Sequence, residues 1–311
     1  MNSQIKKINL NHSFIFFLFC NVFSVVVFKF TNLNISTLFC FLLILTIGVS
    51  HGALDHLKGK KLLTILNIKK FYIFYLIYIL LALSVILVWT IVPAITLIVF
   101  LAVASFHFGK EDTQFLINKN SNLISILYFF RGLLIIITPL YFNFDETVTI
   151  FKMLLIDSEQ FYSSLGFIEK YKIIEIAIGL SALSSIILFL REFNIKKFAI
   201  FLDFFSIIIL NYYLSPLVAF TIYFCFLHSI RHTISLAIEM DNSNLKNGLK
   251  LFAQKAFPLT VLTAIFSVLG LYFLYNVYEL NSAILKIIFI GLASLTFPHI
   301  LLEYFLEKNE K

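Results

Sequence analysis

Six of the seven histidines lie inside or at the ends of long apolar segments, and they form four groups. The groups are HGALDH at 51–56, FHFG at 106–109, HSIRH at 228–232 and PH at 298–299, while His12 belongs to a polar N-terminal tail at 1–12. Ionisable and metal-binding side chains are costly in hydrocarbon and rarely lie there without a partner. We therefore expect several of these imidazoles to build a metal site inside a membrane.

The spacing within two groups constrains which histidines can share a metal. His228 and His232 are four residues apart, so on a helix they lie on one face and can bind one ion together. His51 and His56 are five apart, which places them about 140° apart around a helix unless the helix breaks at Gly52. We expect His51 to be the ligand, with Asp55 or His56 supporting it from behind, because ligating histidines usually donate their other N–H to a carboxylate or carbonyl.

For the remaining polar residues of the apolar segments, the sequence leaves more than one role open. His107 is expected to be a ligand because it lies at the same depth as the other groups, although an interfacial position at a helix end is the alternative. His299 is expected to be a pocket residue behind the ligands, or a direct ligand. Arg131 is expected to pair with Asp55 or Glu111, or else to extend to the membrane interface. Glu303 and Glu307 are expected to be solvated, and the three cysteines to be small buried hydrophobic residues.

These histidines must be positioned by membrane helices. Hydrophobic residues make up 60% of the chain, charged residues 13%, and the mean hydropathy is +0.95. Apolar runs of about 18 residues or more are typical of transmembrane helices. The sequence predicts an all-α, polytopic helix bundle forming a single integral membrane domain over 1–311. Its ten segments are 13–30, 35–56, 71–92, 94–111, 123–141, 171–190, 196–214, 216–238, 255–276 and 283–305, with Pro93 separating the third from the fourth.

The distribution of basic residues predicts the orientation of the chain. If the ten segments alternate and the N-terminus is cytoplasmic, most of the 24 Lys and Arg residues fall on the cytoplasmic side, as the positive-inside rule requires. Both termini are then cytoplasmic, and the net charge of +7 reflects topology rather than nucleic-acid binding. In this topology all four histidine groups lie near the cytoplasmic ends of their segments, so they are expected to meet at one depth.

The ligand types favour redox chemistry over a structural site. Imidazole suits Fe, Cu, Zn and Ni, so the ligands alone do not choose the metal. Structural zinc sites usually include cysteine, and none of the groups contains one. A neutral, histidine-rich site among apolar helices is suited to oxygen chemistry on a lipid-soluble substrate.

Together, HGALDH, FHFGKED, HSIRH and the last PH resemble, in order and spacing over the whole chain, the motifs of the Brp/Blh family of bacterial membrane β-carotene 15,15′-dioxygenases. The resemblance implies a multi-pass protein of a bacterial inner membrane. It also implies an Fe(II) enzyme that uses O₂ to cleave the central double bond of β-carotene into two molecules of all-trans-retinal. The family's iron-binding and catalytic histidines match His51, His107, His228 and His232. By association, a rhodopsin apoprotein is the expected receiver of retinal.

Other functions remain open at this point. Cleavage of a different carotenoid is compatible with the same residues, and so is a membrane carrier or transporter for metal or haem. A di-iron desaturase or hydroxylase is disfavoured, because the chain has no HxxHH box and at most six available histidines. A membrane zinc protease is disfavoured because neither His51 nor His228 belongs to an HExxH motif.

Overall fold

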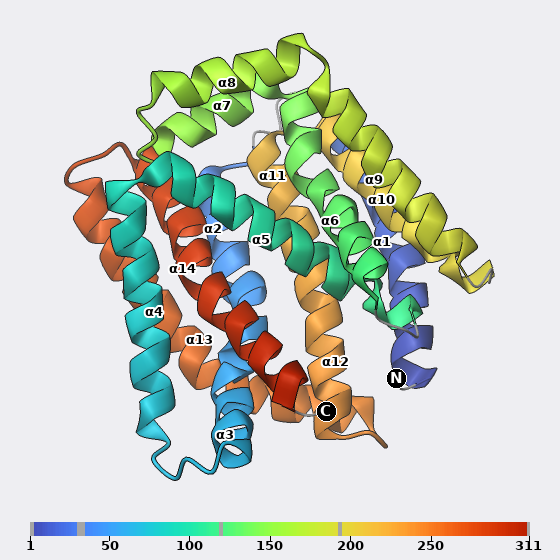
Figure 1. The fold of residues 1–311 in the computed structure, drawn as a ribbon, viewed down its shortest axis with the longest axis vertical. Helices are drawn as coiled ribbons and strands as arrows, with labels where there is room; N and C mark the ends of the chain where they lie inside the picture. The colour runs from blue at the N-terminus through green and yellow to red at the C-terminus, as the bar shows by residue number, and fades with distance from the viewer. Residues whose placement is uncertain (1–2, 30–34, 118–120, 192–194, 310–311) are drawn as a thin grey trace.

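The computed structural model describes residues 3–29, 35–117, 121–191 and 195–309, and every regular element among them is a helix (Figure 1). The first half contains α1 (Ser3–Lys29), α2 (Thr37–Leu43), η1 (Ile44–Gly48), η2 (Val49–Leu54), α3 (Asp55–Ile65), α4 (Tyr72–Ile91), α5 (Pro93–Thr113), η3 (Gln114–Leu116), α6 (Asn122–Phe142) and α7 (Phe144–Met153). The second half contains α8 (Glu159–Lys170), α9 (Ile173–Leu190), η4 (Ile195–Phe198), α10 (Ala199–Tyr213), α11 (Pro216–Ile222), η5 (Tyr223–Ser229), α12 (Ile230–Met240), α13 (Leu245–Tyr275) and α14 (Leu280–Asn309).

The predicted polytopic helix bundle is confirmed. Within the described ranges, nine helical stretches are long and apolar enough to cross a membrane, and a shorter apolar helix spans Ala199–Tyr213. Each of the ten predicted segments overlaps one of them. The expectation of a polar tail over 1–12 was wrong in one respect, because α1 already begins at Ser3. In Figure 1, α7 and α8 lie across one end of the bundle, while α1 begins and α14 ends toward the opposite end.

The predicted break at Pro93 is also confirmed. Helix α4 ends at Ile91 and α5 begins at Pro93, while Val92 between them has non-helical backbone angles of φ −134° and ψ 63°. A helix tolerates proline in its first turn, but proline disfavours helical backbone angles for the residue before it. The break redirects the chain, so that α5 crosses the bundle at a clear angle to α4 (Figure 1).

Helices α5 and α6 approach each other closely at two glycines. A Cβ added to Gly109 would overlap the backbone carbonyl of Tyr128, and one added to Gly132 would overlap the carbonyl of Ser105. Small residues permit such backbone contact between membrane helices. Since Gly109 belongs to the FHFG motif, this contact fixes the helix turn that carries His107.

Two of the helical stretches change their hydrogen-bonding pattern where the histidine groups occur. The stretch Thr37–Ile65 passes from α-helix through a π-helix at η1 and a 3₁₀-helix at η2 before α3. The stretch Pro216–Met240 contains a second π-helix, η5, which includes His228. The helical stretch does not end at Gly52, which lies within η2, so the break that would let His51 and His56 face one ion is not observed there. Short π-helical turns are frequently found at functional sites.

A buried ionic network links α12 to α10 and α1. The Arg231 guanidinium donates to both carboxylate oxygens of Asp203 on α10, at 2.8 and 2.9 Å, and to the Ser13 hydroxyl on α1 at 2.5 Å. Arg231 and Asp203 are both almost completely buried. The three cysteines are free and buried, as predicted.

Candidate metal centre

Four imidazole rings come together in the interior. The centroid of the His107 ring lies 5.3 Å from that of His228 and 5.3 Å from that of His299, and the His299 centroid lies 5.7 Å from that of His232. All four side chains are buried. They come from α5, η5, α12 and α14, so segments far apart in the sequence supply one compact histidine array. The expected meeting of the histidine groups is observed for these four residues.

Three of these histidines are anchored through Nδ1 by a carboxylate. His299 Nδ1 lies 2.9 Å from both oxygens of Asp55, His228 Nδ1 lies 3.3 Å from Asp112 Oδ1, and His232 Nδ1 lies 3.3 Å from Glu111 Oε2. A carboxylate at Nδ1 favours the tautomer that donates from this nitrogen, leaving Nε2 as the nitrogen available to a metal.

Two adjacent acidic residues on α5 contact the two histidines of the HSIRH motif. Asp112 faces His228 and Glu111 faces His232, so neighbouring carboxylates engage histidines one turn apart. Their other oxygens are occupied too: the Tyr223 hydroxyl donates to Asp112 at 2.5 Å, and the Gln114 amide donates to Glu111 at 2.6 Å. Sequence reasoning noted these acids as the end of the FHFGKED motif, with Glu111 as a possible partner of Arg131, and missed their contacts with the histidines.

Glu303 is part of the site rather than solvated, which corrects the sequence-based expectation. Its carboxylate accepts a 2.6 Å bond from the Lys58 ammonium, lies 3.6 Å from His299 Nε2 and lies 3.8 Å from His107 Nδ1. Lys58 Nζ also lies 3.4 Å from His232 Nε2. Glu303 follows His299 by four residues on the same face of α14, and this spacing was the signal that could have placed it here.

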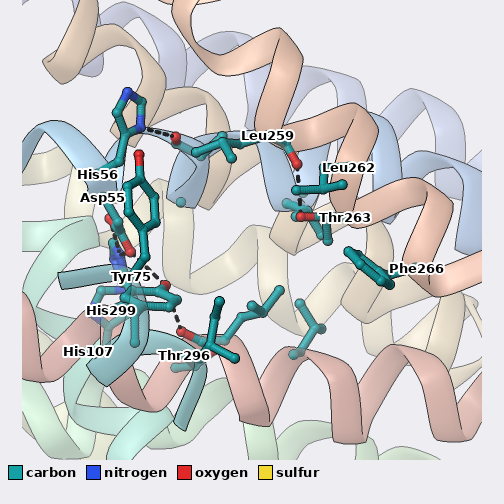
Figure 2. Close-up of a pocket in the computed structure, with 18 of the residues that line it drawn as sticks. Asp55, His56, Tyr75, His107, Leu259, Leu262, Thr263, Phe266, Thr296 and His299 are labelled. Atoms are coloured by element: carbon teal, nitrogen blue, oxygen red, sulfur yellow. Dashed lines mark hydrogen bonds and ion pairs between the residues drawn. The ribbon is translucent and has the colours of Figure 1, made fainter. Parts of the chain in front are cut away.

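An apolar cavity of about 310 Å³ adjoins the array. His107, His228 and His299 line it, together with aromatic residues from four helices: Phe74, Tyr75, Tyr78, Phe108, Phe224 and Phe266. Figure 2 shows His107, His299 and Asp55 gathered at one end, with Leu262 and Phe266 of α13 across from them. The cavity therefore joins a polar, histidine-rich end to a long apolar wall.

The donor set fits a divalent transition metal. It combines several imidazoles, each the kind of ligand that Fe, Cu, Zn or Ni accepts, with carboxylates that orient them and balance positive charge. One potential ligand atom from each of His107, His299 and Glu303 lies within 4.8 Å of the others. These three residues are therefore close enough together for a metal ion to be held among them.

A sequence model of the β-carotene 15,15′-dioxygenase family matches residues 42–307. The chain belongs to this family. It is an oxidoreductase, and all the residues of the histidine array fall within the matched range. It is 28% identical over 270 residues to the β-carotene 15,15′-dioxygenase of uncultured marine bacterium 66A03, and the alignment covers 84% of this chain and 90% of that protein. No solved structure matches the chain.

Three further residues were predicted for the enzyme's site. The backbone of His51 lies in η2, but its side chain lies outside the described residues. His56 lines the cavity, with its Nδ1 2.9 Å from the carbonyl oxygen of Ala53. Asp55 also lines it, and its carboxylate holds the ring of His299.

Arg131 lies away from the cavity, contrary to its predicted place in the pocket. Its guanidinium carbon lies 5.9 Å from the centre of the Phe204 ring, and the side chain is buried rather than extended to an interface. The predicted pairing with Asp55 or Glu111 is not seen among the described residues, because these carboxylates bond instead to His299 and His232.

Proposed function

We propose that this enzyme uses O₂ to cleave the central 15,15′ double bond of β-carotene, giving two molecules of all-trans-retinal. Each carbon of the broken double bond takes one oxygen atom, so one O₂ is consumed for each carotene. The observation that carries this proposal is the buried histidine array opening onto an aromatic, apolar cavity. Membership of the family supports the same chemistry.

Fe(II) is the proposed cofactor. The family resemblance assigns its ligands to His51, His107, His228 and His232, and the last three lie in the described array. When bound, Fe(II) would supply the activation of O₂. Asp112 and Glu111 hold His228 and His232 in the orientation that directs Nε2 away from the carboxylates.

The cavity is the proposed polyene site. A long conjugated chain is bound well by a concave apolar surface with aromatic walls. Ile79 of α4 and Phe266 of α13 line the cavity while 55% and 64% of their surfaces remain exposed, so these two helices form the side through which a lipid-soluble substrate would arrive from the bilayer. Seating the polyene against this wall would decide which double bond meets the histidine end, because a small displacement alters regioselectivity.

The cellular setting is proposed from the sequence. The enzyme would lie in a bacterial inner membrane with both termini in the cytoplasm, since this orientation satisfies the positive-inside rule. Retinal would leave into the bilayer, where a rhodopsin apoprotein could receive it.

The test is expression in a bacterium that accumulates β-carotene, followed by chromatography of the extracted pigments against retinal standards. Loss of β-carotene with retinal as the product is the expected result. Shorter or longer apocarotenals would contradict central cleavage, and unchanged β-carotene in cells containing folded protein, iron and oxygen would contradict the proposed substrate. Feeding other carotenoids to the same cells then identifies the class that is cleaved.

A cavity-filling variant tests the place of the substrate. Thr296 faces the cavity (Figure 2), so Thr296→Phe should reduce retinal formation while leaving bound iron unchanged. Unaltered retinal formation in this variant would show that the polyene binds elsewhere.

A further inference from the structure

We propose that His299 is a direct metal ligand, held in place by Asp55 and Tyr78. This adds a ligand to the set carried over from the family resemblance, and it rests on the proposed metal-dependent function. His299 belongs to the short PH motif of α14, which gives no ligand spacing of its own. The assignment therefore depends on tertiary contacts.

The position of the ring is the first support. The His299 centroid is 5.3 Å from that of His107 and 5.7 Å from that of His232, nearly the same as the 5.3 Å between His107 and His228. With metal–nitrogen distances of about 2.0–2.1 Å, the ring centres of two imidazoles on one ion lie roughly 4.5–5.5 Å apart. The separation of His299 from His107 lies within this range, and its separation from His232 lies just above it. His299 thus occupies an interior place in the array, between two histidines of the assigned set.

The anchoring of the ring is the second support. Both oxygens of Asp55 lie 2.9 Å from His299 Nδ1, and the Tyr78 hydroxyl donates to Asp55 Oδ2 at 2.8 Å. This is the arrangement in which metal-binding histidines are held by a carboxylate that is itself hydrogen-bonded. It matches the relation of Asp112 to His228 and Tyr223. The carboxylate of HGALDH therefore supports the histidine of the PH motif.

The surroundings of Nε2 are the third support. His299 Nε2 lies on the side of Glu303, 3.6 Å from its Oε1, and one ligand atom from each of these residues and from His107 falls within a 4.8 Å cluster. Lys58 holds Glu303 at 2.6 Å, so we assign Glu303 to charge balance and not to coordination. Because Asp55 takes Nδ1, Nε2 is the nitrogen of His299 that we assign to the metal.

Cobalt(II) binding by the purified full-length chain in detergent tests this assignment without carotene. Cobalt content is measured by elemental analysis, and the visible ligand-field bands report the ligands. His299→Ala should weaken Co(II) binding by more than about tenfold and alter these bands. Asp55→Asn, which keeps the shape of the side chain, should weaken binding about tenfold. His12→Ala, which removes the histidine of α1 that is not part of the array, should bind Co(II) as the unmodified chain does.

Chemical rescue separates a lost ligand from a misfolded variant. Added imidazole should restore Co(II) binding and the bands of His299→Ala, because it can fill the space left by the ring. Unmodified affinity and bands in His299→Ala would overturn the assignment, and so would weakened binding that imidazole fails to restore. Failure of this proposal can be told apart from failure of the proposed function. If Co(II) binding depends on His299 but the unmodified chain forms no retinal, only the proposed reaction is rejected. If the unmodified chain forms retinal and His299→Ala binds Co(II) unaltered, only the assignment of His299 as a ligand is rejected.

Discussion

The cavity is bounded on one side by α5, η5 and α14 and on the other by α4 and α13. The two sides differ in the polarity of their side chains and in how far these side chains are buried. On the first side, His107, His228 and His299 are each at most 5% exposed and lie against carboxylates. On the second, Tyr75, Ile79, Leu262 and Phe266 present apolar side chains that are 38–64% exposed.

This difference separates two requirements of the proposed reaction. A metal site needs ligands fixed by packing and by hydrogen bonds to their outer nitrogens, and the close α5–α6 contact at Gly109 and Gly132 provides such rigidity. Capture of a hydrophobic molecule from lipid needs an apolar surface that the bilayer can reach. Substitutions on the first side should therefore affect metal binding, and those on the second should affect substrate alone.

The largest expected effect is the loss of a ligand on the buried side. His228→Ala or His232→Ala should reduce bound iron and retinal formation by at least about 100-fold, since removing even an outer partner of a ligand costs 10–100-fold. Iron is measured by elemental analysis and retinal by chromatography, with His12→Ala as the control that keeps both. Full activity in His232→Ala would remove its assignment as a ligand.

The next largest effect is expected on protein stability, from loss of the buried Arg231–Asp203 ion pair. Asp203→Asn should destabilise the protein by about 3–5 kcal/mol, because it leaves the buried Arg231 guanidinium without its carboxylate. Thermal unfolding in detergent measures the change, and Asp157→Asn, at an exposed position between two helices, is the matched control. A melting temperature as high as that of the unmodified enzyme would show that this network contributes little to the rigid side.

A smaller effect is expected from a carboxylate that orients a ligand. Asp112→Asn should lower iron affinity about 10–100-fold, because the neutral amide orients His228 less well. Asp112→Asn should leave the Arg231 network in place. The Arg231 side chain donates to the backbone carbonyl of Asp112 at 3.1 Å, and the substitution keeps this carbonyl. Iron titration checks the result, and an unchanged affinity would argue that His228 is positioned by packing alone.

The smallest effect is expected on the lipid-facing side. Phe266→Ala should raise KM for β-carotene by about fivefold, equivalent to roughly 1 kcal/mol of lost apolar contact, with iron content unchanged. Phe273→Ala is the matched control, since Phe273 lies on the same helix and is similarly exposed but does not line the cavity. Equal KM values for the two variants would contradict access along α13.

The sequence by itself determined the class of fold, the positions of the ten segments and the break at Pro93, and it identified the histidine groups as the candidate metal ligands. The physical reason is that a membrane-spanning chain must satisfy its backbone hydrogen bonds internally, so long apolar runs become helices whatever their neighbours are. Polar residues within those runs are then conspicuous because they are costly there.

Only the tertiary structure decided which side chains face one another. In the tertiary structure, Asp55 contacts His299, Glu303 and Lys58 lie in the site, and Arg231 bonds to Asp203. The tertiary structure also placed Arg131 outside the cavity. These contacts depend on the rotation and crossing of helices, and the π-helical and 3₁₀ turns at η1, η2 and η5 shift the faces that an ideal helix of 3.6 residues per turn would predict.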